Sequence, residues 1–208
     1  MFQETDPQTR PECQKCGLYR TCTSPAIPGD GLFQGEVILI GEAPDEAADD
    51  TGRIFVGPMG ALLNRVLDQA GYSRRYSYCT HAIKCRPPRN KALDRHVKYC
   101  APLLHEEMKW MPNLKVAVTF GAKALKAVGV EDTLTKCRGV VRPLQIGDRT
   151  ILHVGTWHPS YVLRVPQAES ELLVDLSKIA GMLTGTSGPT PQGVADRDTT
   201  AYRTLIST

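Results

Sequence analysis

The sequence lacks the features that would mark a membrane or secreted protein. No apolar run approaches the length of about 20 residues that a membrane-spanning helix needs. Residues 1–16 contain acidic residues and prolines but no apolar stretch, so they do not resemble a secretory signal. Internal repeats are also absent, and so are low-complexity blocks before the C-terminal stretch. We therefore expect a cytoplasmic protein without a membrane partner.

Length and composition favour one domain. The chain has 208 residues, of which 41% are hydrophobic and 23% charged, and this suits a single sizeable core better than two. Residues 184–208 are rich in Gly, Pro, Ser, Thr and Asp, with little apolar material. This composition predicts a flexible tail after a folded domain at residues 1–183.

Basic residues concentrate in one stretch, although the net charge is only +3. Such a stretch suits a polyanion such as DNA, and the competing interpretation is an ordinary solvated helix face. The stretch contains Arg74, Arg75, Lys84, Arg86, Arg89, Lys91, Arg95 and Lys98.

Apolar, β-branched runs alternate with segments of helical spacing. The runs predict strands at 37–41, 76–83, 116–121 and 150–155. The intervening and following segments predict helices at 61–67, 91–111, 122–128 and 169–183. Because parallel neighbours need crossover helices, this order predicts an α/β fold, a three-layer α/β/α sandwich around a mostly parallel four-stranded sheet.

Polar and unusual residues follow three of the predicted strands. They occupy 41–44, 84–88 and 157–160. In open α/β sheets, ligands bind beyond the carboxyl ends of the strands. We therefore expect these three loops to meet in one functional site.

The seven cysteines do not fit a disulfide framework, because the cytoplasm keeps thiols reduced. Cys13 and Cys16 form a C-x2-C pair, and Cys85 and Cys100 form a wider one. Four thiolates suit either zinc or a [4Fe–4S] cluster, and the wide second pair inclines the interpretation toward the cluster. Cys22 is close enough in sequence to compete with Cys16 as a ligand.

Five segments together resemble the ordered motifs of family 4 uracil-DNA glycosylases. They are 13–16, 41–57, 84–88, Cys100 and 158–164, and the resemblance covers roughly residues 10–183. It implies a DNA-repair hydrolase that flips uracil or another abnormal base out of DNA, cleaves the N-glycosidic bond and leaves an abasic site. It also implies a mainly structural [4Fe–4S] cluster on Cys13, Cys16, Cys85 and Cys100.

The resemblance assigns roles near the reacting bond. Glu42 would orient the attacking water and favour the positive charge on the sugar, and His158 would stabilise the negative charge on the departing base. The backbone around Ala43 would meet the base, and Phe55 would stack on it. Taken singly, Glu42 also suits a loop residue, His158 a structural turn and Phe55 ordinary core.

The remaining implied contacts are with single- or double-stranded DNA, bound by a monomer. Residues 159–164 would enter the minor groove, with Tyr161 or Leu163 as the wedge. The other expected DNA contacts are Lys84, Arg86, Ser160 and Arg164.

One departure from the family pattern bears on the substrate. His81 stands where the family usually has an Asn that reads uracil through a donor and an acceptor together. One imidazole nitrogen donates or accepts, but does not do both. The alternatives are therefore a glycosylase with altered specificity, a variant that links covalently to DNA, or a DNA-binding member without turnover. A buried, satisfied histidine is the structural alternative for His81, and a structural zinc protein is a third hypothesis for the chain.

Overall fold

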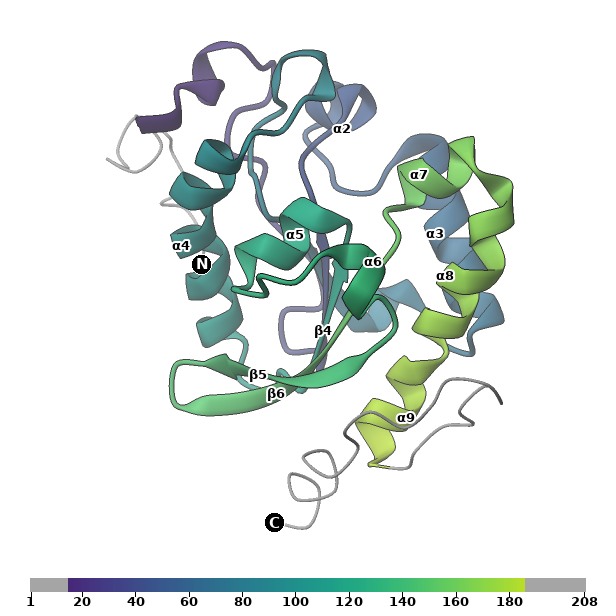
Figure 1. The fold of residues 1–208 in the computed structure, drawn as a ribbon. Coiled ribbons are helices and arrows are strands. Elements are labelled where there is room, and N and C mark those ends of the chain that lie inside the picture. The colour runs from purple at the N-terminus through teal and green to yellow at the C-terminus, as the bar shows by residue number, and fades with distance from the viewer. Residues whose placement is uncertain (1–14, 186–208) are drawn as a thin grey trace.

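A computed structural model describes residues 15–185, which form a six-stranded sheet covered by helices on both faces (Figure 1). The strand order across the sheet is β1-β3-β2-β4-β6-β5. The strands are β1 (Asp30–Gly31), β2 (Val37–Gly41), β3 (Ser77–His81), β4 (Val116–Phe120), β5 (Val141–Ile146) and β6 (Arg149–Thr156).

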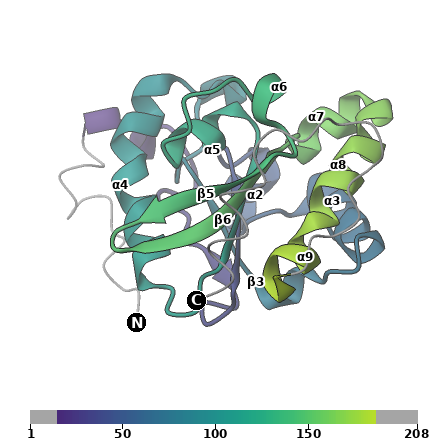
Figure 2. The same cartoon turned by 60° about the horizontal axis from the view of Figure 1, so that its bottom comes forward.

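The four central strands are those expected from the sequence, and all of their pairings are parallel. The sheet differs from the four-stranded expectation at its two edges. β1 pairs antiparallel with β3, and β5 pairs antiparallel with β6 as a hairpin that Figure 2 shows on the outer side of the sheet. The three-layer architecture is thus confirmed, whereas the strand number was too low.

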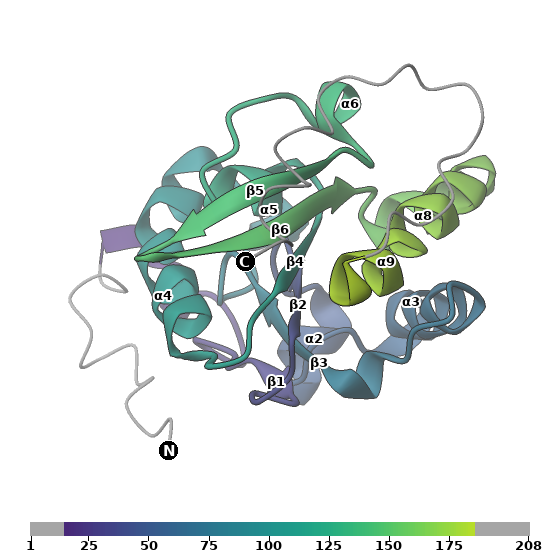
Figure 3. The ribbon, with the colours of Figure 1, turned by 90° about the horizontal axis from the view of Figure 1, so that it is seen from below.

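The helices divide between the two faces. Seen along the sheet in Figure 3, α4 lies on one side of β2, β3 and β4, and α3, α8 and α9 lie on the other. The α-helices are α2 (Glu46–Thr51), α3 (Gly57–Gln69), α4 (Asp94–Trp110), α5 (Ala122–Ala127), α6 (Leu134–Cys137), α7 (Pro159–Arg164), α8 (Glu169–Leu176) and α9 (Lys178–Thr184). Short 3-10 helices are η1 (Leu18–Arg20), η2 (Arg74–Tyr76), η3 (Pro88–Asn90) and η4 (Pro166–Ala168).

Each face of the sheet has its own hydrophobic core, because successive strand residues point to opposite sides. In β2, Val37 and Leu39 pack with α3, α8 and α9, whereas Ile38 and Ile40 pack with α4 and α5. All four are fully buried. A strand buried on both faces needs the continuous apolar run seen in the sequence.

Two expectations lie outside the described residues. Cys13 precedes residue 15, and the predicted tail falls almost entirely beyond residue 185. Between residues 15 and 185, no helix combines the length and apolar character that spanning a bilayer requires.

Lys84 is buried beneath the sheet edge rather than exposed. Its ammonium contacts the Glu107 carboxylate at 2.6 Å and the Thr80 hydroxyl at 2.5 Å, and the Lys84 side chain is only 5% exposed. This corrects the expectation that Lys84 contacts the DNA backbone, since its ammonium cannot reach a phosphate without leaving Glu107. The pair instead joins the end of β3 to α4.

We predict that Glu107→Ala lowers the free energy of unfolding by about 3–5 kcal/mol, because it leaves the Lys84 ammonium buried without its counter-ion. Urea unfolding followed by circular dichroism measures this. Glu131→Ala, at an exposed glutamate elsewhere in the chain, is the control and should stay within about 0.5 kcal/mol of wild type. Equal effects of the two substitutions would contradict the structural role of the Lys84 pair.

Candidate functional site

The strand order places four chain segments side by side at the carboxyl edge of the sheet. Here Gly41 of β2 is in register with His81 of β3, and Phe120 of β4 with Thr156 of β6. The loops that follow β2, β4 and β6 therefore start next to one another. The loop after β3 also starts here, because His81 pairs with Gly41. The three loops expected to meet, 41–44, 84–88 and 157–160, thus start at this edge, and the start of α5 after β4 joins them.

Glu42 is held by the start of α5. One of its carboxylate oxygens, Oε1, accepts a hydrogen bond of 2.8 Å from the backbone N–H of Lys123. Gly121 lies so close that a Cβ there would be 2.5 Å from the same oxygen, and its φ of +89° also requires glycine. Burial raises the pKa of Glu42, partly offset by Lys123. A carboxylate with a raised pKa is suited to accept a proton.

His158 presents a free hydrogen-bonding atom. It is the N-cap of α7, where its Nδ1 accepts from the backbone N–H of Ser160 at 3.2 Å and lies 2.8 Å from the Ser160 hydroxyl. Because Nδ1 accepts, the proton of the neutral ring belongs on Nε2. Nε2 is buried and has no partner among the described residues. Burial, with a smaller effect of Arg164, lowers the pKa of His158 to about 4, so the ring is a neutral donor at pH 7.

His81 is fully buried, yet neither of its ring nitrogens has a partner within the described part of the chain. It is therefore not the satisfied core histidine that the sequence left open. Burial lowers its pKa to about 3, with smaller effects of His158 and Lys84, and the ring is neutral. Gly41 makes room for it, since a Cβ there would lie 2.7 Å from His81 Cδ2.

Phe55 lies against His81 with ring centroids 5.5 Å apart, and its ring is only 2% exposed in the ligand-free chain. Its φ of +48° is uncommon for a residue with a side chain. Arg74 holds this backbone by donating to the Phe55 carbonyl at 2.9 Å, with its guanidinium 6.0 Å from the ring centroid. Arg74 is a site residue that the sequence placed only among the basic residues. Nothing local in the sequence marks its long-range contact.

The segment expected to enter DNA forms the short helix α7. Leu163 is 46% exposed and Arg164 is also exposed, whereas Val162 is buried and anchors the helix. Tyr161 is half-buried and its ring contacts Trp157 at a centroid distance of 4.9 Å. Ser160 faces His158 through the contacts described above. The helix thus offers Leu163 and Arg164 to an approaching partner.

The basic stretch is divided by β3. Arg74 and Arg75 lie in η2, before the strand, so their backbone is at the opposite end of β3 from Arg86, although the Arg74 guanidinium reaches the Phe55 carbonyl. Arg86 follows the strand and is partly exposed, donating to Asn90 at 2.9 Å and pairing with Glu46 at 3.3 Å. Of the two DNA-contact residues expected in this stretch, only Arg86 lies at the surface near the site.

Three of the four cysteines expected to bind a cofactor, Cys16, Cys85 and Cys100, lie within the described residues. Among residues 15–185, the thiols of Cys16 and Cys100 contact each other, and so do those of Cys22 and Cys85. The hydrogen bond from Cys100 lowers the pKa of Cys16 to about 6. The backbone N–H of Ala26 donates to Cys85 Sγ at 3.2 Å.

These thiols are of the chemical type that binds zinc or an iron–sulfur cluster. Among residues 15–185, no three His, Cys, Asp or Glu side chains form a group that could hold a metal ion. A backbone N–H that donates to a cysteine sulfur, as Ala26 does to Cys85, also suits an iron–sulfur ligand. Cys16, Cys85 and Cys100 are therefore chemically suited to such a cluster.

The segment that carries these N-terminal cysteines is fastened to the site. Asp49 of α2 is buried, and its carboxylate accepts from the backbone N–H groups of Thr23 and Ser24 at 3.1 and 2.9 Å. Asp45 caps the same helix by accepting from the backbone N–H of Ala48. Both acids thus order the loop after Glu42.

Comparisons with known proteins agree with this architecture. The model of the uracil DNA glycosylase superfamily matches residues 28–177. The type-4 uracil-DNA glycosylase of Sulfurisphaera tokodaii is 33% identical over 80% of this chain and 78% of its own, and that of Archaeoglobus fulgidus is 33% identical over 86% and 91%. A type-5 uracil-DNA glycosylase of Thermus thermophilus is 30% identical over 75% and 81%. The resemblance read from the sequence motifs is confirmed, and the chain belongs to the uracil-DNA glycosylase superfamily.

Proposed function

We propose that this protein is a monofunctional DNA glycosylase, which removes uracil or another abnormal base and leaves an abasic site for base excision repair. The observation that carries the proposal is the neutral His158 ring. Its buried Nε2 has no partner in the described chain and lies at the same sheet edge as the half-buried Glu42. Names of similar proteins support the same activity.

The two groups complement the two charges that form as the bond breaks. Electrons of the N-glycosidic bond pass to the base, and His158 Nε2–H donates a hydrogen bond to the base oxygen that becomes negative. Glu42 favours the positive charge on the sugar and positions the water. The water oxygen bonds to C1′ and its proton passes to Glu42, after which the base anion takes a proton from solvent.

DNA contacts follow from exposure at the same edge. We propose that Leu163 or Tyr161 fills the space that an extruded base leaves, and the exposure of Leu163 supports this role. Ser160, Arg164 and Arg86 are the proposed phosphate contacts. Phe55 and the Ala43 backbone would meet the extruded base, with Phe55 as the stacking surface. Lys84 has no part in this interface. The substrate is DNA, single- or double-stranded, bound by a monomer in the cytoplasm.

We also propose that Cys13, Cys16, Cys85 and Cys100 hold a [4Fe–4S] cluster. When bound, the cluster supplies a rigid cross-link among three segments distant in sequence. The thiols themselves join η1, the loop after β3 and α4, which border the site. Cys22 contacts Cys85 and is the alternative to Cys16 that the sequence left open.

A second candidate function is a member with altered specificity, and His81 favours it. A neutral imidazole without a fixed partner can present a donor or an acceptor to the base, whereas an amide presents both together. The Phe55 stack is tolerant of base identity. Base selection at His81 should therefore be less strict than with Asn.

For Glu42→Gln we expect excision to slow about 100-fold or more, since the carboxylate that accepts the proton of the attacking water is lost. The melting temperature at pH 7 should not fall, because Gln keeps an oxygen for Lys123 N–H and removes a charge that burial disfavours. Wild-type activity should fall on acidification from above pH 4.5, since the raised pKa protonates Glu42 earlier than an ordinary carboxyl. Single-turnover rates on a uracil oligonucleotide measure this, with Glu36→Gln at the other end of β2 as control. Wild-type rates in Glu42→Gln would exclude the proposed role.

His81→Asn should raise the preference for uracil over hypoxanthine and xanthine by about tenfold, because the amide restores paired readout worth about 1–3 kcal/mol. Excision from a panel of oligonucleotides carrying each base, and a modified pyrimidine, gives the ratios. His105→Asn on α4 is the matched control and should leave them unchanged. An unchanged ratio in His81→Asn would remove His81 from base selection.

Salt-dependent DNA binding by the wild-type protein without any base release would favour the non-catalytic alternative.

Anaerobically purified wild-type protein should absorb near 400 nm and contain about four iron atoms per chain. Cys100→Ser should lose both signals and melt at a lower temperature, because one thiolate ligand is gone. Cys137→Ser, at a buried cysteine on α6, should keep them. Zinc in place of iron in the wild-type protein would contradict the cluster.

A further inference from the structure

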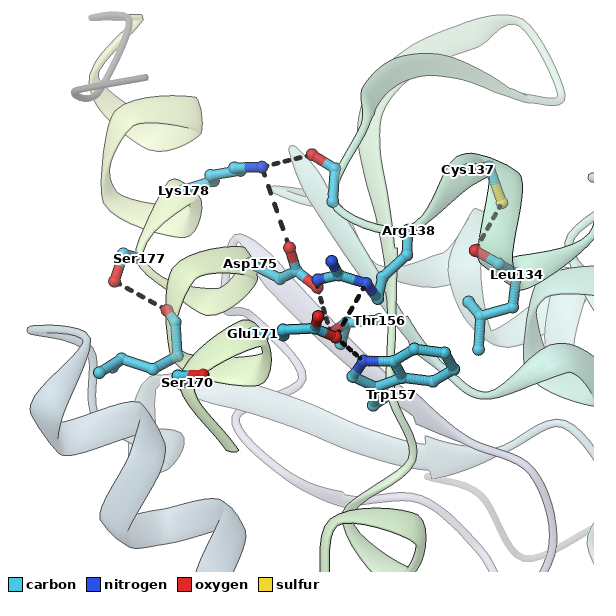
Figure 4. A network of polar contacts seen from close by, with 12 residues as sticks. Leu134, Cys137, Arg138, Thr156, Trp157, Ser170, Glu171, Asp175, Ser177 and Lys178 are labelled. Atoms are coloured by element: carbon cyan, nitrogen blue, oxygen red, sulfur yellow. Dashed lines mark hydrogen bonds and ion pairs between the residues drawn. The ribbon is translucent and has the colours of Figure 1, made fainter. Parts of the chain in front are cut away.

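The turn between β6 and α7 is fastened to α8 by side chains. It begins at Thr156, the last residue of β6, and continues through Trp157 and His158, so it joins the sheet directly to the proposed catalytic histidine. Figure 4 shows that side chains from α8 and from the loop after α6 surround the first two of these residues. His158 itself takes its position from this turn and from its capping contact with Ser160.

Asp175 of α8 anchors the strand end. It is almost fully buried, and its Oδ2 accepts from the Thr156 hydroxyl at 2.7 Å and from Arg138 Nη1 at 2.8 Å. Lys178 lies 3.9 Å from the other carboxylate oxygen. A buried carboxylate with this many donors is rigid, because breaking any one contact leaves charge uncompensated. Arg138 is thereby fixed as well.

Glu171 lies one turn earlier on α8 and holds the next residue of the turn. Its Oε2 accepts from the indole Nε1 of Trp157 at 2.5 Å and lies 3.5 Å from Arg138 Nε. Arg138 also lies over the indole, 5.6 Å from the ring centroid. The Trp157 ring is thus held at its edge by Glu171 and on its face by Arg138, as Figure 4 shows.

The fixed indole in turn supports α7. Trp157 and Tyr161 contact each other with ring centroids 4.9 Å apart and planes inclined at 35°. Tyr161 is in the first turns of α7, followed closely by the exposed Leu163. Any rotation of the indole would remove the surface against which Tyr161 rests.

Glu171 places a negative charge next to the helix proposed to enter DNA. Its side chain is 47% exposed beside a segment proposed to face DNA, where a carboxylate repels phosphates. A surface ion pair with Arg138 at 3.5 Å contributes little to stability. The short hydrogen bond that Glu171 accepts from the indole N–H of Trp157 is therefore the interaction that can explain a carboxylate at this position.

We propose that Glu171, with Arg138, is a positioning residue for base extrusion: it fixes Trp157, and through the Trp157–Tyr161 pair it holds α7 in the orientation needed to enter duplex DNA. The inference rests on the proposed glycosylase function and extends it to residues outside the reacting centre. It assigns no contact with the scissile bond to Glu171.

Glu171→Ala should lower kcat on a uracil-containing duplex about tenfold, because the wedge is no longer held in place. KM should not rise, since a repelling charge has been removed. Excision from the same single strand should change far less, because no stacked partner strand resists extrusion. Glu171→Gln should restore the duplex rate, as its amide oxygen still accepts from the indole. Glu169→Ala, which breaks the Arg65–Glu169 pair two residues earlier on α8, is the matched control.

A second readout does not depend on catalysis. In a Trp110→Phe background the emission reports Trp157, and its anisotropy in the free protein should fall in Glu171→Ala but not in Glu169→Ala. The inference is overturned if the duplex-to-single-strand ratio or the anisotropy changes no more in Glu171→Ala than in Glu169→Ala. If wild type releases no base from any strand, the proposed function fails, and the anisotropy still decides whether Glu171 holds the indole.

Discussion

Parallel pairing of four neighbouring strands is the constraint from which the site follows. Each crossover helix returns the chain to the same end of the sheet, so β3, β2, β4 and β6 all finish at one edge. The register then sets Gly41 beside His81 and Phe120 beside Thr156. Glycines at positions 41 and 121 let the side chains of His81 and Glu42 occupy the space between strand ends. A larger residue at either position would displace a proposed functional group.

Several features of the proposed site lower the stability of the fold. Burying an unpartnered polar group such as either nitrogen of His81 costs about 1–3 kcal/mol. The left-handed backbone of Phe55 adds a cost of the order of 1–3 kcal/mol, held in place by Arg74. Such unfavourable features persist only where the two hydrophobic cores fix the strands beneath them. They are concentrated around the proposed base-binding residues, where local rules are expected to give way to function.

The sequence predicted the strands that are continuous apolar runs, and it missed the edge strands and the side-chain contacts between residues far apart in the chain. The four parallel strands were predictable because each is buried on both faces. β1 has only two residues, both exposed. β5 contains Pro143, and its apolar and polar residues do not alternate regularly, so neither strand was predictable from the sequence. Lys84 read as a surface cation because its partner, Glu107, lies 23 positions away. The motifs located Glu42, His81 and His158, but which ring nitrogens lack partners emerged only from the packing around them.

The long-range attachment of the N-terminal segment has a consequence for synthesis. Ala26 bonds to Cys85, which lies 59 positions later, and the neighbouring Cys16 meets Cys100 on α4. The first-made part of the domain therefore cannot dock until well over a third of the chain has left the ribosome. Its cysteines remain open to oxidants during that interval, and the proposed cluster can assemble only after Cys100 has left the ribosome.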